Sequence, residues 1–486
     1  MVCVPIWLPL CLIVSGLAVE YSGFHTQDTA HRPNIILVMA DDHGWGDTGY
    51  HGHPFALTPH LDQMSREGIR FDRWYAAAPV CSPTRGSCLT GRHPSRYGIY
   101  SANVGRLKPE EVCLAELLSE QGYATGHFGK WHLGTLTTKV KDANRGGPGS
   151  EDVYSPPWEN GFDACFSTES KVPTFDPMKN PSRVSREAKR GVGTGEFYGT
   201  RYWTGVDSPV DFSELSGDDS RLIMDRAVAF LRRAVADQKP FFLVVWFHAP
   251  HTPVVADQSH RDLYPEHPHG EYGQHYHGCI TAMDEQIGRL RAELDKVGQS
   301  DNTMLWYASD NGPESSATNG AGSAGTFRGR KRSLLEGGIR VPATLVWPAR
   351  ILRPFTTEVP CVTSDYFPTI VDALDLEMPN RPYDGISLMP LIDGQPFDRT
   401  KPIGFQFKNQ VALMNGRFKI YSDDKGQSWQ LFDLQQDPQE SKDLSEAMPE
   451  QRADMIASVQ EWIASCGASD NGMDYDASAA ESQPVR

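Results

Sequence analysis

Three unbroken apolar segments constrain the fold of this chain more than any other feature of its sequence. Each has the length of a strand and contains no charged residue, at positions 34–40, 241–247 and 303–308. Strands with this pattern are buried on both faces, as in a parallel sheet that helices cover on each side. Helical patterns occur between them, at residues 58–69, 84–92, 110–121, 218–236 and 276–297. The alternation predicts an α/β fold with a large, mostly parallel central sheet flanked by helices.

The chain beyond about residue 400 has a different pattern. Short strand-like segments precede an amphipathic helical pattern at 449–464, and they span 402–407, 410–414, 417–422 and 429–433. We therefore predict a main domain at 33–395 and a small antiparallel sheet with a helix at 396–466. Residues 467–486 are acidic and rich in Ala and Ser, which is typical of a disordered tail. Residues 134–217 are rich in Gly and Pro, and we expect long loops that set substrate selectivity there.

The first residues of the chain are typical of an export signal. Residues 2–19 are uncharged and largely apolar, and Gly16 and Ala18 provide small residues for cleavage. We interpret residues 1–18 as a signal peptide, with a buried first helix or a membrane anchor as the alternatives. No later segment is long and apolar enough to span a bilayer, so we expect no stable membrane insertion. The single Asn-x-Ser/Thr motif, at Asn180, is blocked by proline, which favours a bacterial periplasmic or secreted protein over a lysosomal one.

The three apolar segments are followed by polar residues that suit a metal site. The first precedes Asp41 and Asp42, the second His248, and the third Asp310 and Asn311. In open α/β sheets ligands bind beyond the carboxyl ends of strands, so we expect these ends to share one crevice. Carboxylate and amide oxygens suit a hard cation such as Ca²⁺ or Mg²⁺. The alternative is that the two polar pairs are turn residues or helix caps.

Cys81 begins the most distinctive motif of the chain, Cys-Ser-Pro-Thr-Arg, which continues as Leu-Thr-Gly-Arg to Arg92. A cysteine is more often half of a disulfide, or simply buried, than a nucleophile, and both readings remain alternatives. A helix from residue 83 would place Cys81 and Cys88 about 10 Å apart, which is beyond disulfide reach. Six further cysteines follow the leader and permit disulfides without requiring them: Cys88, Cys113, Cys165, Cys279, Cys361 and Cys466.

Two glycine-flanked segments supply candidate cations. In Gly-Lys-Trp-His-Leu-Gly, Lys130 and His132 lie two residues apart and would share a face in extended structure. A second segment, residues 328–342, contains Lys331 together with four arginines and four glycines or prolines. Ordinary solvated loops are the alternative for each segment.

Together these motifs resemble the type I sulfatases, the formylglycine-dependent branch of the alkaline-phosphatase-like superfamily. The resemblance runs from Pro33 to about Leu444, and the details are most similar to the arylsulfatase and N-acetylgalactosamine-6-sulfatase group. Thr84 is a mild departure, since serine or alanine is common there. The resemblance implies that a maturation enzyme oxidises Cys81 to formylglycine (3-oxoalanine). It also implies a set of Ca²⁺ ligands: Asp41, Asp42, Asp310, Asn311 and the modified residue 81.

The chemistry of sulfate esters supports the roles that the resemblance implies. The ester is anionic, so the metal, Arg85, Lys130 and Lys331 would neutralise charge in the transition state. A formylglycine hydrate offers one hydroxyl to attack sulfur, and proton loss from the second releases sulfate and re-forms the aldehyde. His132 is the expected base for this release, and His248 with Lys331 is the expected acid for the leaving alcohol.

The resemblance assigns weaker roles to a few neighbours. His251, Pro250 and Pro253 are expected to shape the substrate mouth. Arg92 is expected either to support the modified segment or to have an ordinary structural role.

The sequence therefore predicts a calcium-dependent sulfuric ester hydrolase that acts on a sulfated carbohydrate, with activity on small aryl sulfates. Two alternatives remain, a phosphonate or phosphodiester hydrolase of the same superfamily and a catalytically inactive carbohydrate-binding relative. The formal net charge of −16 argues against a nucleic-acid partner, which would require a basic face.

Overall fold

The computed structural model describes residues 1–2, 32–181, 195–314 and 320–475. Its centre is a nine-stranded sheet in the order β11-β2-β10-β8-β1-β7-β4-β5-β6. The three apolar segments form the parallel middle of this sheet, as β1 (Asn34–Ala40), β7 (Phe241–Trp246) and β8 (Thr303–Ser309). The prediction of a large, mostly parallel sheet is confirmed.

The remaining strands extend the sheet on both sides of this middle. β4 and β5 continue it in parallel, whereas β6 and β10 run antiparallel to their neighbours. Their bounds, with those of the edge strands, are β4 (Ala124–Lys130), β5 (Ala164–Thr168), β6 (Tyr202–Trp203), β10 (Ala343–Val346), β2 (Ile69–Phe71) and β11 (Phe355–Thr357). β5 and β6 lie within residues 134–217, so the prediction of loops throughout that region is wrong at these strands.

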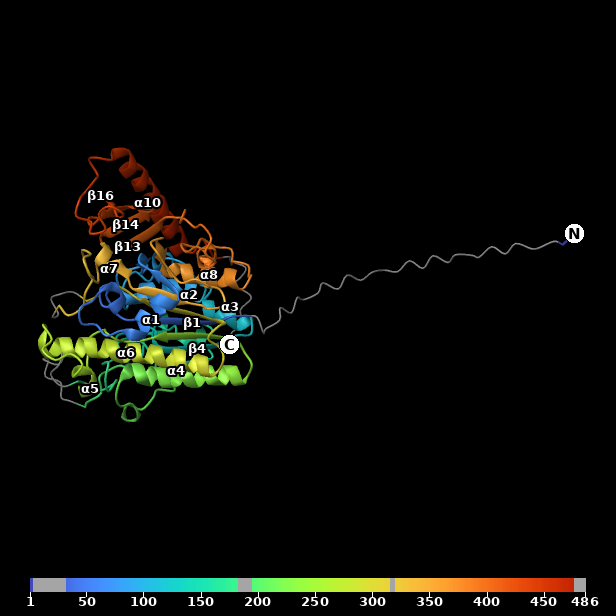
Figure 1. Ribbon diagram of the computed structural model, residues 1–486, viewed down its shortest axis with the longest axis vertical. Coiled ribbons are helices and arrows are strands. Elements are labelled where there is room, and N and C mark those ends of the chain that lie inside the picture. The colour runs from blue at the N-terminus through green and yellow to red at the C-terminus, as the bar shows by residue number, and fades with distance from the viewer. Residues whose placement is uncertain (3–31, 182–194, 315–319, 476–486) are drawn as a thin grey trace.

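Helices cover both faces of the sheet, because successive side chains of each strand point to opposite faces. In β1, Ile35 and Leu37 enter one apolar cluster, and Ile36 and Val38 enter another. Figure 1 shows α4 and α6 lying along one face and α2 and α8 on the other. The helices are α1 (Pro59–Glu67), α2 (Cys81–Thr90), α3 (Leu114–Glu120), α4 (Asp219–Ala236), α5 (Gln258–Arg261), α6 (Gly270–Lys296), α7 (Glu336–Ile339), α8 (Tyr366–Ala373) and α9 (Met389–Ile392).

A four-stranded antiparallel sheet and a long helix form the C-terminal part of the molecule (Figure 1). These elements are β13 (Ile403–Phe407), β14 (Gln410–Asn415), β15 (Phe418–Ser422), β16 (Gln430–Asp433) and α10 (Pro449–Asp470). A small three-stranded sheet shares an apolar cluster with this part and consists of β12 (Cys361–Val362), β3 (Trp74–Tyr75) and β9 (Arg340–Val341). The predicted antiparallel sheet with its helix is confirmed.

The chain remains ordered beyond the point where the sequence predicts a disordered tail. α10 continues to Asp470, and Asp474 accepts a hydrogen bond of 2.7 Å from the buried Arg92. Tyr475 donates a hydrogen bond of 2.6 Å to Glu111. The prediction of disorder is therefore wrong for residues 467–475, and residues 476–486 lie outside the described part.

Three further expectations concern export and cysteine pairing. The predicted signal peptide lies outside the described residues, apart from its first two. Among the described helices, none is long and apolar enough to cross a membrane. Every cysteine from Cys81 to Cys466 is a buried, unpaired thiol, so the disulfides that the sequence permits do not form.

Candidate active site

The carboxyl ends of β1 and β8 meet and bring three of the candidate metal ligands together. Ala40 lies opposite Ser309 in the parallel register, so the residues that follow the two strands are neighbours. The backbone N–H of Asp42 donates to Asp310 Oδ1 at 3.1 Å, and Asn311 Nδ2 donates to Asp42 Oδ1 at 2.7 Å. Asp42 has a φ of 66°, a left-handed conformation that turns the chain out of the sheet.

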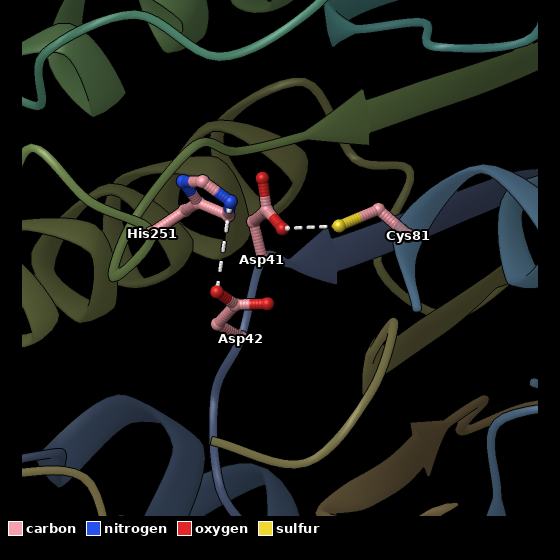
Figure 2. Close-up of side chains that lie close together, drawn as sticks. All are labelled: Asp41, Asp42, Cys81 and His251. Atoms are coloured by element: carbon pink, nitrogen blue, oxygen red, sulfur yellow. Dashed lines mark hydrogen bonds and ion pairs between the residues drawn. The ribbon is translucent and has the colours of Figure 1, made fainter. Parts of the chain in front are cut away.

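Cys81 is the first residue of α2 and enters the same crevice. Its thiol donates to Asp41 Oδ1 at 3.3 Å, and Figure 2 shows this contact beside Asp42 and His251. The side chain is buried, and burial together with the charge of Asp41 raises the pKa of the thiol. An unmodified Cys81 is therefore a protonated thiol and a poor nucleophile.

Three buried cations surround these carboxylates. Each forms its shortest ion pair with a different acidic side chain: Lys130 Nζ with Asp41 Oδ2 at 2.6 Å, Lys331 Nζ with Asp42 Oδ1 at 2.5 Å, and Arg85 Nη2 with Asp310 Oδ2 at 2.6 Å. Burial would raise the pKa of Asp41, but the charges of Lys130, His251 and Arg85 hold it well below its usual value. Burial instead raises the pKa of Asp42 and raises that of Asp310 to about 7. The crevice thus holds three buried acidic side chains and three matching cations.

Comparison with known proteins identifies this arrangement. The sequence profile of the family described as Sulfatase matches residues 33–376, and one described as N-sulphoglucosamine sulphohydrolase, C-terminal, matches residues 322–466. The chain belongs to the sulfatase family. It is a sulfuric ester hydrolase.

Curated relatives and solved structures agree with this assignment. The chain is 32% identical to N-acetylgalactosamine-6-sulfatase of Canis lupus familiaris over 433 residues, which cover 86% of this chain and 76% of the relative. It is 28% identical to arylsulfatase A of Bos taurus, with 94% of this chain and 90% of the relative covered. The structure of Ps i-CgsB in complex with k-i-k-neocarrahexaose superimposes with a TM-score of 0.75 at 26% identity, covering 93% of this chain and 96% of that one.

The carboxylate and amide oxygens at this site fit a hard cation. Asp41, Asp42, Cys81 and His251 each offer one ligand atom, and these atoms lie within 4.8 Å of one another. Within the described residues, Asp42 Oδ2 and Asn311 Oδ1 are buried acceptors without a hydrogen-bond donor. Buried oxygens normally have a partner, and a divalent cation would satisfy both.

His248 does not enter this cluster, which corrects the role that the sequence predicted for it. It is fully buried, and both of its ring nitrogens are occupied, Nδ1 by Asp219 and Nε2 by Thr168, each at 2.8 Å. No ring nitrogen is left for a leaving alcohol. His248 is therefore a structural residue that ties the end of β7 to α4 and β5.

His251, rather than His248, lies next to the candidate metal ligands. The chain reverses after β7, with a hydrogen bond of 2.7 Å from the backbone N–H of His251 to His248 O. This turn puts His251 Nε2 3.6 Å from Asp42 Oδ2. Nδ1 donates to Thr252 O at 2.6 Å, which leaves Nε2 as the nitrogen that can exchange a proton. Burial lowers the pKa of His251 well below its usual value, against the charge of Asp41.

His132 lies beside the site, but not in the extended conformation that its spacing from Lys130 suggests. Its φ is 61°, so the chain leaves β4 by a turn. Nε2 is 2.8 Å from Asn103 Oδ1, and Nδ1 is buried without a partner among the described residues. Sequence reasoning missed Asn103, because a single exposed asparagine carries no motif.

Arg92 lies at the far end of α2 and has a structural role. Its guanidinium is fully buried between Glu111, at 3.1 Å, and Asp474, at 2.7 Å. These contacts fix α2 to the C-terminal residues of the chain.

A second group of candidate ligands, Asp47, His53 and His277, does not fit a metal. Its ligand atoms lie within 4.8 Å of one another. However, the backbone N–H groups of Phe55 and Ala56 donate to His53 Nδ1 at 3.1 and 2.9 Å. The neutral ring then carries its proton on Nε2, which faces Asp47 and has no lone pair for a metal.

Proposed function

We propose that this sulfatase removes sulfate from a sulfated carbohydrate, using formylglycine at position 81 and a bound Ca²⁺ ion. The observation that carries the proposal is the position of Cys81, at the N-terminus of α2 and against Asp41 in a crevice lined by three cations. The formylglycine mechanism is typical of the sulfatase family, whose profile matches residues 33–376, and this supports the same chemical change at Cys81. A maturation enzyme of the producing cell would make that change.

Formylglycine would supply a hydrated aldehyde as the nucleophile, and Ca²⁺ would add positive charge beside it. The ion would be held by Asp41, Asp42, Asp310 and Asn311. Mg²⁺ is the second candidate, but the ligands come from two strand ends and offer mixed carboxylate and amide oxygens, which suits the more flexible coordination of Ca²⁺.

The charges of the site suit an anionic substrate. Three carboxylates face three cations, Arg85, Lys130 and Lys331, so a divalent ion would leave the crevice with a net positive charge. In a site that excludes water this charge binds a sulfate ester and stabilises its transition state. We assign His251, together with Lys331, to protonation of the leaving alcohol, and His132 to proton removal during sulfate release. The negative charge of the bound ester would raise the low pKa of His251, so that Nε2 could take up the proton that it donates.

We propose a carbohydrate substrate because two proteins similar to this chain are described with sugars. The name of canine N-acetylgalactosamine-6-sulfatase specifies a sulfated amino sugar as its substrate. The Ps i-CgsB structure contains a bound oligosaccharide. We expect activity on small aryl sulfates too, since phenols leave readily. The phosphonate monoester hydrolase of Agrobacterium radiobacter, at 19% identity and a TM-score of 0.62, shares the fold and provides the second candidate activity.

Two measurements test this proposal. Peptide mass spectrometry should find formylglycine at position 81, and the matured protein should release sulfate from defined sulfated sugars. Full activity with an unmodified thiol would overturn the nucleophile. A higher kcat/KM for matched phosphonates than for sulfate esters would overturn the substrate class.

We also propose that the protein is exported, on the basis of the leader at residues 1–18. N-terminal sequencing of the protein from its native cells should begin after Ala18, and a mature chain that retains the leader would contradict export.

A further inference from the structure

Asn103, an exposed asparagine at the edge of the active site, contacts the ring of His132. His132 Nε2 is 2.8 Å from Asn103 Oδ1, and the His132 ring is 4% exposed, whereas Asn103 faces solvent. Asn144 Nδ2 donates to the same Oδ1 at 2.9 Å and to Ser170 Oγ at 3.0 Å. Asn103 and His132 both have left-handed backbones, with φ of 64° and 61°.

The contact determines which ring nitrogen carries the proton. Asn103 Oδ1 is an acceptor, because it receives the Asn144 amide, so His132 Nε2 must be a donor. In a neutral ring the lone pair is then on Nδ1, which is buried and has no partner among the described residues.

The surroundings of the ring keep it neutral. Burial, together with the positive charges of Lys130, Arg145 and Arg85, lowers the pKa of His132 well below its usual value. The neutral ring has one proton, and the contact with Asn103 places that proton on Nε2.

We propose that Asn103 is a positioning residue that fixes His132 as the Nε2–H tautomer and so presents Nδ1 as the proton acceptor of the reaction. The proposal rests on the role given to His132 above. Asn103 itself touches no reacting atom. Asparagine suits the position because it tolerates a left-handed backbone and accepts hydrogen bonds through a short side chain.

Nuclear magnetic resonance tests the tautomer without any turnover. In full-length protein labelled with ¹⁵N-histidine, the signals of His132 are identified by their loss in His132→Gln. We expect long-range ¹H–¹⁵N correlations of the Nε2–H form in the wild type and in Asn103→Asp, which keeps the acceptor oxygen. Asn103→Gly keeps the backbone conformation but removes the acceptor, and the Nε2–H form should give way to a tautomer mixture. Val104→Ala, which shortens the exposed neighbour of Asn103, is the matched control and should keep the Nε2–H form.

Kinetics of the matured enzyme provide the second readout. If His132 acts during sulfate release, Asn103→Gly should lower kcat about tenfold, the effect of one lost hydrogen bond, with KM falling in parallel. A burst of alcohol release should precede the slow steady state. Asn103→Asp should restore kcat to within about threefold of the wild type.

Three outcomes would overturn the proposal. The first is His132 with its proton on Nδ1 in the wild type, and the second is an unchanged tautomer in Asn103→Gly. The third is an equal fall of kcat and kcat/KM without a burst, which would make Asn103 a substrate contact. Failure of the proposed function is distinct, since it would appear as no sulfate release by the wild type, whatever the spectra show.

Discussion

At the scale of single residues, two histidines only three positions apart have different surroundings. His248 is packed between Asp219 and Thr168, whereas His251 faces Asp42 across 3.6 Å. The sequence analysis assigned the role of acid to His248, the histidine directly after the strand, because ligands of open α/β sheets bind beyond the carboxyl ends of strands. The turn after β7 reverses that order, and a turn of this kind depends on tertiary contacts such as the hydrogen bond from Asp41 N to Ala249 O.

Substituting these two histidines should separate catalysis from stability. We expect His251→Gln to lower kcat/KM on a sugar sulfate by about 100-fold or more, because a sugar alcohol is a poor leaving group and needs a proton. The loss should be much smaller on a nitrophenyl sulfate, whose phenol leaves without one. Parallel steady-state kinetics on the two substrates measure this difference.

The matched control is His248→Gln. It should lower the thermal unfolding temperature by breaking two buried hydrogen bonds, each worth about 1 kcal/mol, with the same effect on both substrates. If His248→Gln shows the leaving-group dependence and His251→Gln does not, the assignment of His251 is wrong.

At the scale of elements, the strands that the sequence revealed are those with unbroken apolar runs. β4 and β5 were not predicted as sheet strands, because they contain Gly, Ser, Thr and a buried histidine. His127 in β4 is buried because its Nδ1 binds Ser167 Oγ of β5 at 2.7 Å. These strands combine apolar core side chains, such as Phe128 and Phe166, with polar ones that are paired by hydrogen bonds, and a single sequence does not display that pairing.

The packing of α10 on the C-terminal sheet rests on one small residue. A Cβ at Gly404 in β13 would lie 2.3 Å from the ring of Trp462 in α10. Gly404→Ala should therefore displace α10 and lower the free energy of unfolding by about 1–3 kcal/mol.

Gly467 in α10 provides the comparison, since a Cβ there meets no atom within 4 Å. Gly467→Ala should raise the free energy of unfolding by up to about 1 kcal/mol, because alanine favours a helix. Chemical denaturation of both variants measures the two effects, and equal effects of the same sign would contradict the packing argument.

At the scale of the whole molecule, the active site joins segments that are far apart in the sequence. Its charged groups come from the ends of β1, β4 and β8, from α2 and from the loop before α7. A ligand that binds these groups only when they are assembled stabilises the folded chain as a whole.

Ca²⁺ should therefore raise the unfolding temperature of protein first treated with a chelator. At a concentration 100 times its dissociation constant, the ion should add about 2.7 kcal/mol to the free energy of unfolding. The gain should be lost in Asp42→Asn and retained in Asp393→Asn, where a surface ion pair with Arg350 is removed instead. A gain of the same size in Asp42→Asn would place the ion elsewhere.

Buried histidines should make the fold less stable in mild acid. Burial lowers the pKa of His93 to about 4, although the nearby Asp384 opposes this shift. The unfolded chain, with a histidine pKa of about 6.5, then binds more protons than the folded chain as the pH falls below that value. Between pH 7.5 and pH 5 this residue should cost about 2 kcal/mol of stability. Unfolding measured at both pH values should show a smaller loss in His93→Gln, and identical losses in the two proteins would contradict this pKa.

The sequence by itself determined the central parallel sheet, the antiparallel C-terminal sheet, and the acidic, basic and thiol groups of the site. Apolar runs and short motifs report on local structure and on chemical identity, and both are properties of neighbouring residues. Only the tertiary structure decided that His251 rather than His248 faces the ligands, that His132 leaves β4 by a turn, and that Asn103 holds its ring. These facts depend on how loops from separate strands pack against each other, and that packing is set by hydrogen bonds between residues distant in the chain.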